Sequence, residues 1–164
     1  YAVEVRNAGW LDEGLVALLA EHRAALVISD YFTMPGLAGV RQRLDPLTTD
    51  FAYVRFLGAR KPMDALIARK KEQGSRREFD QLLVDRTEEM RRSIPDLKWL
   101  TERAGRLMVY FNNHFASKAV VNAVMIKGQL GEPVTGTYPK AFVERYPETA
   151  SIVSTEMAPE LALE

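Results

Sequence analysis

The sequence contains no cysteine, only two histidines and no excess of charge, with 22 basic and 22 acidic side chains among its 164 residues. Without cysteine, a disulfide framework and a cysteine-ligated metal site are both excluded. No run approaches the roughly 20 apolar residues that a membrane-spanning helix requires. Proteins that bind polyanions along a broad surface usually carry a strong basic excess, which is absent here. We therefore expect a soluble, cytoplasmic, globular protein with no membrane partner.

Four segments have the pattern of β-strands, and helical segments separate most of them. Residues 1–6 alternate apolar and polar side chains, and residues 24–30 form an almost wholly apolar run that ends in Asp30. The other two predicted strands are residues 51–57 and 106–112. We predict helices over residues 10–23, 78–92, 96–104 and 115–127, an interruption at Pro95, and a polar loop over residues 31–50. Strands that alternate with helices predict an α/β fold with a parallel sheet.

Polar residues at the carboxyl ends of these strands are typical of (β/α)8 barrels, whose sites lie at that face. A complete barrel has eight strands and typically about 250 residues, whereas this sequence offers four strands. We predict a partial TIM barrel over residues 1–128 and an irregular tail over residues 129–164, with at most one short helix near residues 140–146. The sequence opens mid-strand on Tyr1, without an initiator methionine or a leader, so we expect a fragment of a longer protein. Exposed sheet edges would favour self-association.

Five runs of the sequence resemble, in the same order, the domain-of-unknown-function family 72, also called YecE-like. They are AVEVRNAGWL (2–11), LVISD (26–30), TTDFAYVRFLG (48–58), VDRTEEMRR (84–92) and VYFNNHFA (109–116). The resemblance covers about residues 1–127 and corresponds to the C-terminal half of the family, which implies half of a TIM barrel and no established activity. Members usually have a glycine and then a proline where Ser117 and Val120 stand here. We therefore expect a more ordinary helix start at this point, without the close backbone approach that a glycine allows.

The candidate site residues are the polar side chains on or after the predicted strands. Parallel strands place their carboxyl ends at one rim, so these side chains are expected to converge. Arginine forks bind phosphate or carboxylate groups, and asparagine and tyrosine hydrogen-bond to a sugar or a base. A carboxylate whose pKa is raised by burial would act as a general base. We predict Glu4 and Asp30 as catalytic residues, and the ligand-binding residues Arg6, Tyr53, Arg55, Asn112, Asn113 and His114.

Each of these residues also has a structural alternative. Glu4, Arg6 and Arg55 would form a plain ion pair, since buried charges in a scaffold are usually paired. Asp30, Asn112 and Asn113 would instead cap the turns that follow them. No metal site is predicted, because zinc requires three or four clustered ligands and His114 stands alone. The residues identify no cofactor.

Three functional hypotheses remain open at this point. The first is an enzyme that acts on a phosphorylated or otherwise anionic small molecule at the rim of the barrel. The second is a protein that binds or hydrolyses a nucleic-acid phosphodiester, with the basic run at residues 70–77 as backbone contacts. The zero net charge disfavours this second hypothesis. The third is an inactive, truncated fragment.

Overall fold

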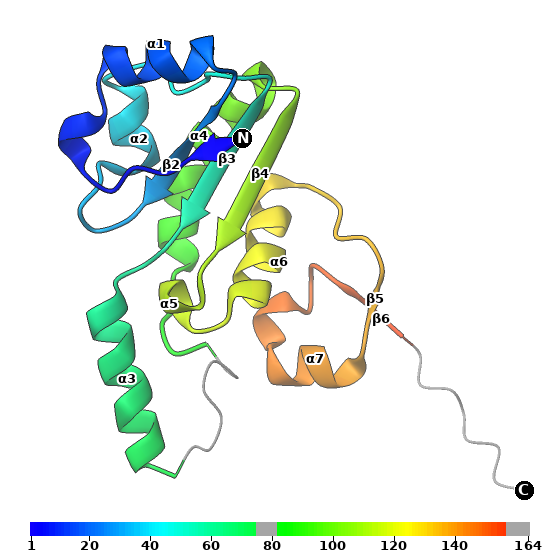
Figure 1. The fold of residues 1–164 in the computed structure, drawn as a ribbon. Helices are drawn as coiled ribbons and strands as arrows, with labels where there is room; N and C mark the ends of the chain where they lie inside the picture. The colour runs from blue at the N-terminus through cyan, green and yellow to red at the C-terminus, as the bar shows by residue number, and fades with distance from the viewer. Residues whose placement is uncertain (75–81, 157–164) are drawn as a thin grey trace, which may run out of the picture.

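The computed structural model of the chain describes residues 1–74 and 82–156 (Figure 1). Its centre is one sheet of four parallel strands in the order β1-β2-β3-β4. The strands are β1 (Ala2–Val3), β2 (Ala25–Asp30), β3 (Phe51–Phe56) and β4 (Arg106–Phe111). The predicted α/β class and the four parallel strands are confirmed. The first strand is shorter than predicted, because only its first residues pair with β2.

Helices lie along the chain between and after these strands. Those up to β4 are η1 (Ala8–Trp10), α1 (Glu13–Glu21), α2 (Gly36–Arg41), α3 (Arg60–Glu72) and α4 (Thr87–Arg103). After β4 come α5 (Asn113–Ala116), α6 (Ala119–Leu130), α7 (Lys140–Arg145) and the 3-10 turn η2 (Pro147–Thr149). Two short strands, β5 (Thr137–Tyr138) and β6 (Ser154–Thr155), pair in parallel. In the part of the chain that the structure describes, no helix is long and apolar enough to cross a membrane.

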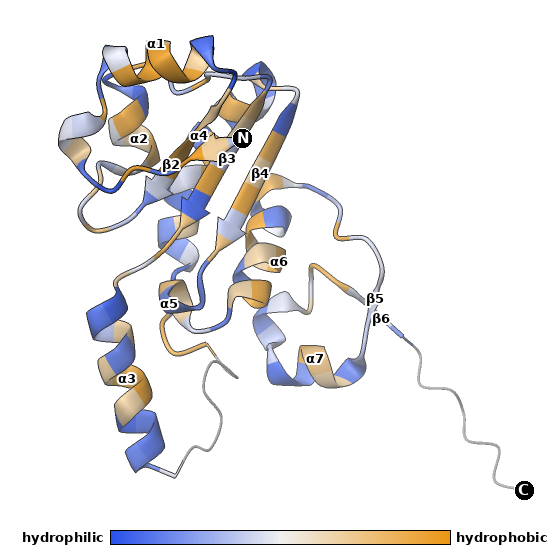
Figure 2. Ribbon diagram, viewed as in Figure 1, coloured by the Kyte–Doolittle hydropathy of each residue, from blue (hydrophilic) through white to orange (hydrophobic). Residues whose placement is uncertain are grey.

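One face of the sheet is covered by helices and forms the core. Along β3, Ala52, Val54 and Phe56 are buried, and they alternate with the half-buried residues between them. In Figure 1, helix α4 lies behind the sheet and α6 lies beside β4. The apolar colour runs along the strands, and it gives way to hydrophilic colour at the carboxyl end of β3 (Figure 2). The opposite face of β3 and β4 is the more open one, since Tyr110 on β4 is 49% exposed.

Helix α2 lies where the sequence predicted only a loop. The glycines and prolines of residues 31–50 obscure a short amphipathic segment, in which Leu37 and Val40 are both buried. These two residues are three positions apart, so they lie on one helical face. The prediction of a loop over the whole segment was therefore wrong.

Helix α4 continues through Pro95, which the sequence analysis placed as an interruption. A proline inside a helix typically costs about 3 kcal/mol, because one hydrogen bond is lost and the ring meets the preceding turn. The helix buries Met90, Leu97 and Leu100 on either side of the proline. Burial of a large apolar side chain contributes roughly 1.5–3 kcal/mol, so three of them outweigh the proline. Residues 78–81, where the predicted helix was to begin, lie outside the described residues.

The predicted helix over residues 115–127 is divided into α5 and α6. Ser117 separates them with a φ of +84°, in the left-handed region, and its side chain is fully buried. The Ser117 Oγ has no hydrogen-bond partner among the described residues. The expectation of an ordinary helix start was therefore wrong. Serine adopts here a backbone conformation that suits glycine, the residue that the family resemblance implies at this position.

Candidate functional site

Glu4 bridges two arginines beside the sheet. Its Oε1 accepts a hydrogen bond of 2.7 Å from Nε of Arg6, and its Oε2 accepts one from Nη1 of Arg55. The Glu4 side chain is 16% exposed, whereas that of Arg6 is 54% exposed and that of Arg55 is 34% exposed. One partly buried negative charge thus holds two positive charges nearer to solvent. The group carries a net positive charge.

The contact between Glu4 and Arg55 crosses a strand. Glu4 follows β1 and Arg55 lies on β3, while β2 runs between the two strands. Strands that flank a third strand lie about 10 Å apart, a distance that the long side chains of a glutamate and an arginine span together. The contact therefore joins the two strands across β2.

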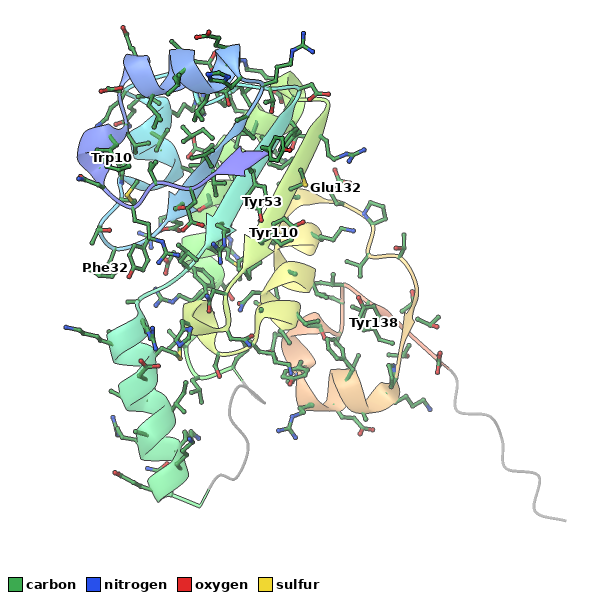
Figure 3. The ribbon with its side chains drawn as sticks, viewed as in Figure 1. Trp10, Phe32, Tyr53, Tyr110, Glu132 and Tyr138 are labelled. Atoms are coloured by element: carbon green, nitrogen blue, oxygen red, sulfur yellow. The ribbon has the colours of Figure 1, made fainter. Side chains whose placement is uncertain are left out.

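Aromatic rings lie next to the two arginines. The rings of Tyr53 and Tyr110 stack at a centroid distance of 4.9 Å, on the neighbouring strands β3 and β4 (Figure 3). Arg55 is opposite Tyr110 in the register of these strands. The Arg6 guanidinium lies 5.4 Å from the ring centroid of Tyr31. The open face therefore combines cationic forks with phenol rings.

Glu4 is held in its ionised form. Burial alone would raise the pKa of this carboxyl group, but the hydrogen bonds and positive charges of Arg6 and Arg55 together lower it below its usual value. Both carboxylate oxygens are also engaged by the arginines. A carboxylate in this state is a poor proton acceptor.

Asp30 ends β2 and belongs to a different environment. It pairs in register with Phe56, whose side chain is buried on the helix-covered face, whereas Arg55 on the same strand lies on the open face. Burial raises the pKa of the Asp30 carboxyl, and the negative charge of Glu89 raises it further, while Arg86 lowers it. Strand alternation thus separates Asp30 from the Glu4 group, although both lie toward the carboxyl end of the sheet.

The two asparagines after β4 cap helices. Asn112 Oδ1 accepts the His114 backbone N–H at 2.9 Å, and Asn113 Oδ1 accepts the Ala119 backbone N–H at 2.9 Å. The capping alternative is therefore the one that the hydrogen bonds support. In the hydrogen bonds of both asparagines to described residues, only the side-chain oxygen takes part.

The His114 ring lies between Asn112, the N-cap of α5, and Asp64 on α3. Its Nδ1 lies 2.8 Å from Asn112 Oδ1, and its Nε2 lies 3.3 Å from Asp64 Oδ1 on α3. Because Asn112 Oδ1 already accepts a backbone N–H, it is an acceptor toward the imidazole as well. Among residues 1–74 and 82–156, no group of three metal-ligating side chains is present. His114 and Asp64 alone do not make a metal centre.

Gly58 allows the backbone of His114 and Phe115 to lie close to the end of β3. It has a φ of +68°, and a Cβ added there would lie 2.5 Å from the Phe115 Cα, in collision with the backbone of His114 as well. Edge-to-face contacts of the Phe115 ring with Phe56 and Phe111, each at a centroid distance of 5.4 Å, hold α5 at the sheet. The Asn-Asn-His segment is therefore fixed at the carboxyl end by a glycine and an aromatic cluster.

The predicted residues thus fall into two groups. Glu4, Arg6 and Arg55 contact one another, and the stacked pair that contains Tyr53 adjoins Arg55. The second group is the turn of Asn112, Asn113 and His114, and Asp30 contacts neither group through a hydrogen bond among the described residues. The sequence analysis missed Tyr31 and Tyr110 as neighbours of the arginines. The alternation along β3 predicts that Tyr53 and Arg55 share one face. It does not predict that Tyr110 lies beside them, because the sequence does not reveal the register between β3 and β4.

A hollow of about 620 Å³ lies elsewhere on the molecule. It is lined by Leu107 and Val109 of β4 and by residues of α4 and α6. Because Leu107 and Val109 alternate with Tyr110, this hollow is on the helix-covered face. None of the predicted site residues lines it. We place the candidate site on the open face instead, since the charged groups gather there.

Three solved structures that are similar to this chain are all described as DUF72 family proteins. A DUF72 family protein of Thermotoga maritima is similar at 28% identity with a TM-score of 0.53, covering 80% of this chain and 46% of that protein. Two structures of a DUF72 family protein of Enterococcus faecalis, at 21% and 20% identity, have TM-scores of 0.53 and 0.51. They cover 85% and 79% of this chain, and 50% and 48% of the relative. This chain spans about half the length of these relatives.

The family model described as protein of unknown function DUF72 matches residues 1–146. The match continues past residue 128 and through α7, farther than the resemblance in the sequence analysis. Among curated proteins, none is significantly similar to this chain. On the strength of the family match, the chain belongs to the DUF72 family of proteins of unknown function.

Proposed function

We propose that the chain forms part of a (β/α)8 barrel and binds an anionic small molecule, such as a phosphorylated one, at the carboxyl rim of its sheet. The observation that carries this proposal is the Glu4 bridge to Arg6 and Arg55. It leaves a net positive, half-exposed pair of guanidinium groups on the open face. Guanidinium groups bind phosphate and carboxylate oxygens bidentately.

In this proposal Arg6 and Arg55 contact the anion and Glu4 positions them. Glu4 is ionised and doubly engaged, so this positioning role suits it better than the acid-base role considered from sequence. The phenol of Tyr53 and the amide nitrogens of Asn112 and Asn113 contact the neutral part of the ligand, together with His114. Asp30 has no contact with the anion in this proposal, because it lies on the helix-covered face; burial raises the pKa of its carboxyl there.

Isothermal titration calorimetry with inorganic phosphate and with a sugar phosphate tests the proposal. We expect saturable binding that weakens about tenfold or more in Arg55→Ala, since a charge-assisted hydrogen bond contributes about 1.5–3 kcal/mol. Arg91→Ala is the matched control, because Arg91 forms an exposed ion pair with Glu88 on α4. Equal affinities of the wild type and Arg55→Ala for every anion would contradict the proposal.

Titration with DNA at two salt concentrations distinguishes the nucleic-acid alternative. Binding to a single-stranded or double-stranded DNA oligonucleotide would fall steeply between low and moderate salt, since phosphate contacts release counterions. We expect no such binding at low salt from this chain of zero net charge. Tight, salt-sensitive binding to DNA would favour the alternative over a small anionic ligand.

A further inference from the structure

Ser29 carries a buried hydroxyl group that has no hydrogen-bond partner among the described residues. It lies on β2 and is only 2% exposed, and its Oγ is the unpartnered atom. A hydroxyl that is removed from water without a new hydrogen bond lowers the stability of the fold. Such groups are rare in native structures, and each of them needs a physical explanation. A ligand that accepts the missing hydrogen bond is one such explanation.

Strand alternation directs the Ser29 side chain toward the candidate site. Its neighbour Ile28 on β2 is opposite Val54 of β3, and both are buried in the core under the helices. The next side chain along β2 takes the other face of the sheet. Ser29 therefore shares the open face with Arg55, the residue that is opposite it in the register.

The contact between Glu4 and Arg55 crosses β2, the strand of Ser29. Glu4 engages Nε of Arg6 and Nη1 of Arg55. A guanidinium group has five N–H donors, so both arginines keep further N–H groups for another anion. Their side chains are long and partly exposed, so their charged ends can shift without a movement of the strands. An anion that draws the two charged ends together thus gains access to the hydroxyl between β1 and β3.

We propose that the Ser29 hydroxyl is a third donor of the anion site and makes it selective for phosphate groups over carboxylates. This inference rests on the proposed anion binding. A carboxylate has two oxygens, which the two guanidinium groups engage, whereas the phosphate group of a monoester has three terminal oxygens. The third oxygen accepts a hydrogen bond from Ser29 Oγ, which satisfies the buried hydroxyl. The ligand class is therefore a phosphate monoester rather than a carboxylic acid.

Isothermal titration calorimetry of Ser29→Ala with inorganic phosphate and with acetate tests the inference. We expect the phosphate affinity of the variant to be about tenfold or more weaker than that of the wild type, because a hydrogen bond to a charged group is lost. The acetate affinity should be unchanged. In urea denaturation without phosphate, Ser29→Ala should have a higher midpoint than the wild type, because an unpaired buried hydroxyl is removed.

Ser117→Ala is the matched control. Its Oγ is also buried without a partner among the described residues, but Ser117 lies between α5 and α6. This variant should keep the wild-type affinity for both anions.

Two results in calorimetry would overturn the inference and leave the proposed anion binding intact. They are equal phosphate affinities of the wild type and Ser29→Ala, and an equal loss of phosphate and acetate affinity in that variant. A lower urea midpoint of Ser29→Ala would also overturn it, because the hydroxyl would then stabilise the fold without an anion. No binding of phosphate or acetate to the wild type would instead refute the proposed function, and the inference with it.

Discussion

Replacement of Gly58 by alanine tests how the Asn-Asn-His segment is held at the sheet. Gly58 has a φ of +68°, and the added Cβ would meet the backbone of His114 and Phe115 at the start of α5. The atoms that block this Cβ belong to the backbone, which moves less easily than a flexible side chain. This backbone is also held in place, since Asn112 caps α5 and the Phe115 ring packs against Phe56. The turn cannot move aside without disturbing these contacts.

Two terms add up in the expected loss of stability. The left-handed backbone costs a residue with a Cβ roughly 1–2 kcal/mol. Insertion of a methyl group into a packed region typically costs a further 1–3 kcal/mol. We therefore expect Gly58→Ala to lower the free energy of unfolding by about 2–5 kcal/mol, out of the roughly 5–15 kcal/mol that a domain usually has.

Gly36→Ala separates the two terms. Gly36 has nearly the same φ, +67°, but nothing lies within 4 Å of the position of its Cβ. Urea denaturation followed by circular dichroism should therefore give only the backbone term of about 1–2 kcal/mol for this variant. Equal losses for the two variants would refute the close approach between Gly58 and α5.

Three further predictions concern the residues around the site. Ser117→Gly should raise the free energy of unfolding by about 1 kcal/mol, because it relieves a left-handed serine and removes a buried hydroxyl without a partner; an unchanged or lower value in urea denaturation would contradict this. Asp30→Asn should raise the thermal midpoint at pH 7. The pKa of Asp30 is raised in the folded protein, so its ionised carboxylate destabilises the fold at pH values above the folded pKa, and this penalty is absent below the usual value of 3.8. The difference from wild type should shrink toward pH 4, and a difference independent of pH would refute the assignment. A double-mutant cycle with Glu4→Gln and Arg55→Gln should give a coupling energy of about 1 kcal/mol, and a coupling of zero would contradict the contact across β2.

Local patterns in the sequence were enough to predict the sheet. Each strand is a short apolar or alternating run, and the helices between the strands require parallel pairing. Local patterns were not enough to predict two of the helices, which depend on tertiary packing. Helix α4 crosses Pro95 because buried side chains on both sides outweigh the proline, and α2 is stable because Leu37 and Val40 reach the core. Neither effect is visible in the helical propensity of the segment alone.

The candidate site could be predicted only in part for a related reason. The alternation along one strand places Tyr53 and Arg55 on one face, and the same rule separates Asp30 from Arg55 once the register is known. Proximity of strand ends at a rim does not decide which face a side chain takes. The contact of Glu4 with Arg55 depends on the strand order, which places only β2 between β1 and β3, and the Tyr110 stack depends on the β3–β4 register. Both are long-range properties of the fold.

Nuclear magnetic resonance of the arginine Nε–H groups during a titration with inorganic phosphate tests the central claim most directly. If Glu4 holds Arg6 and Arg55 as an anion-binding pair, their two Nε–H signals should shift together and saturate, while the signal of Arg91 on α4 should not move. Signals of Arg6 and Arg55 that stay unchanged, or that move no more than that of Arg91, would contradict the account.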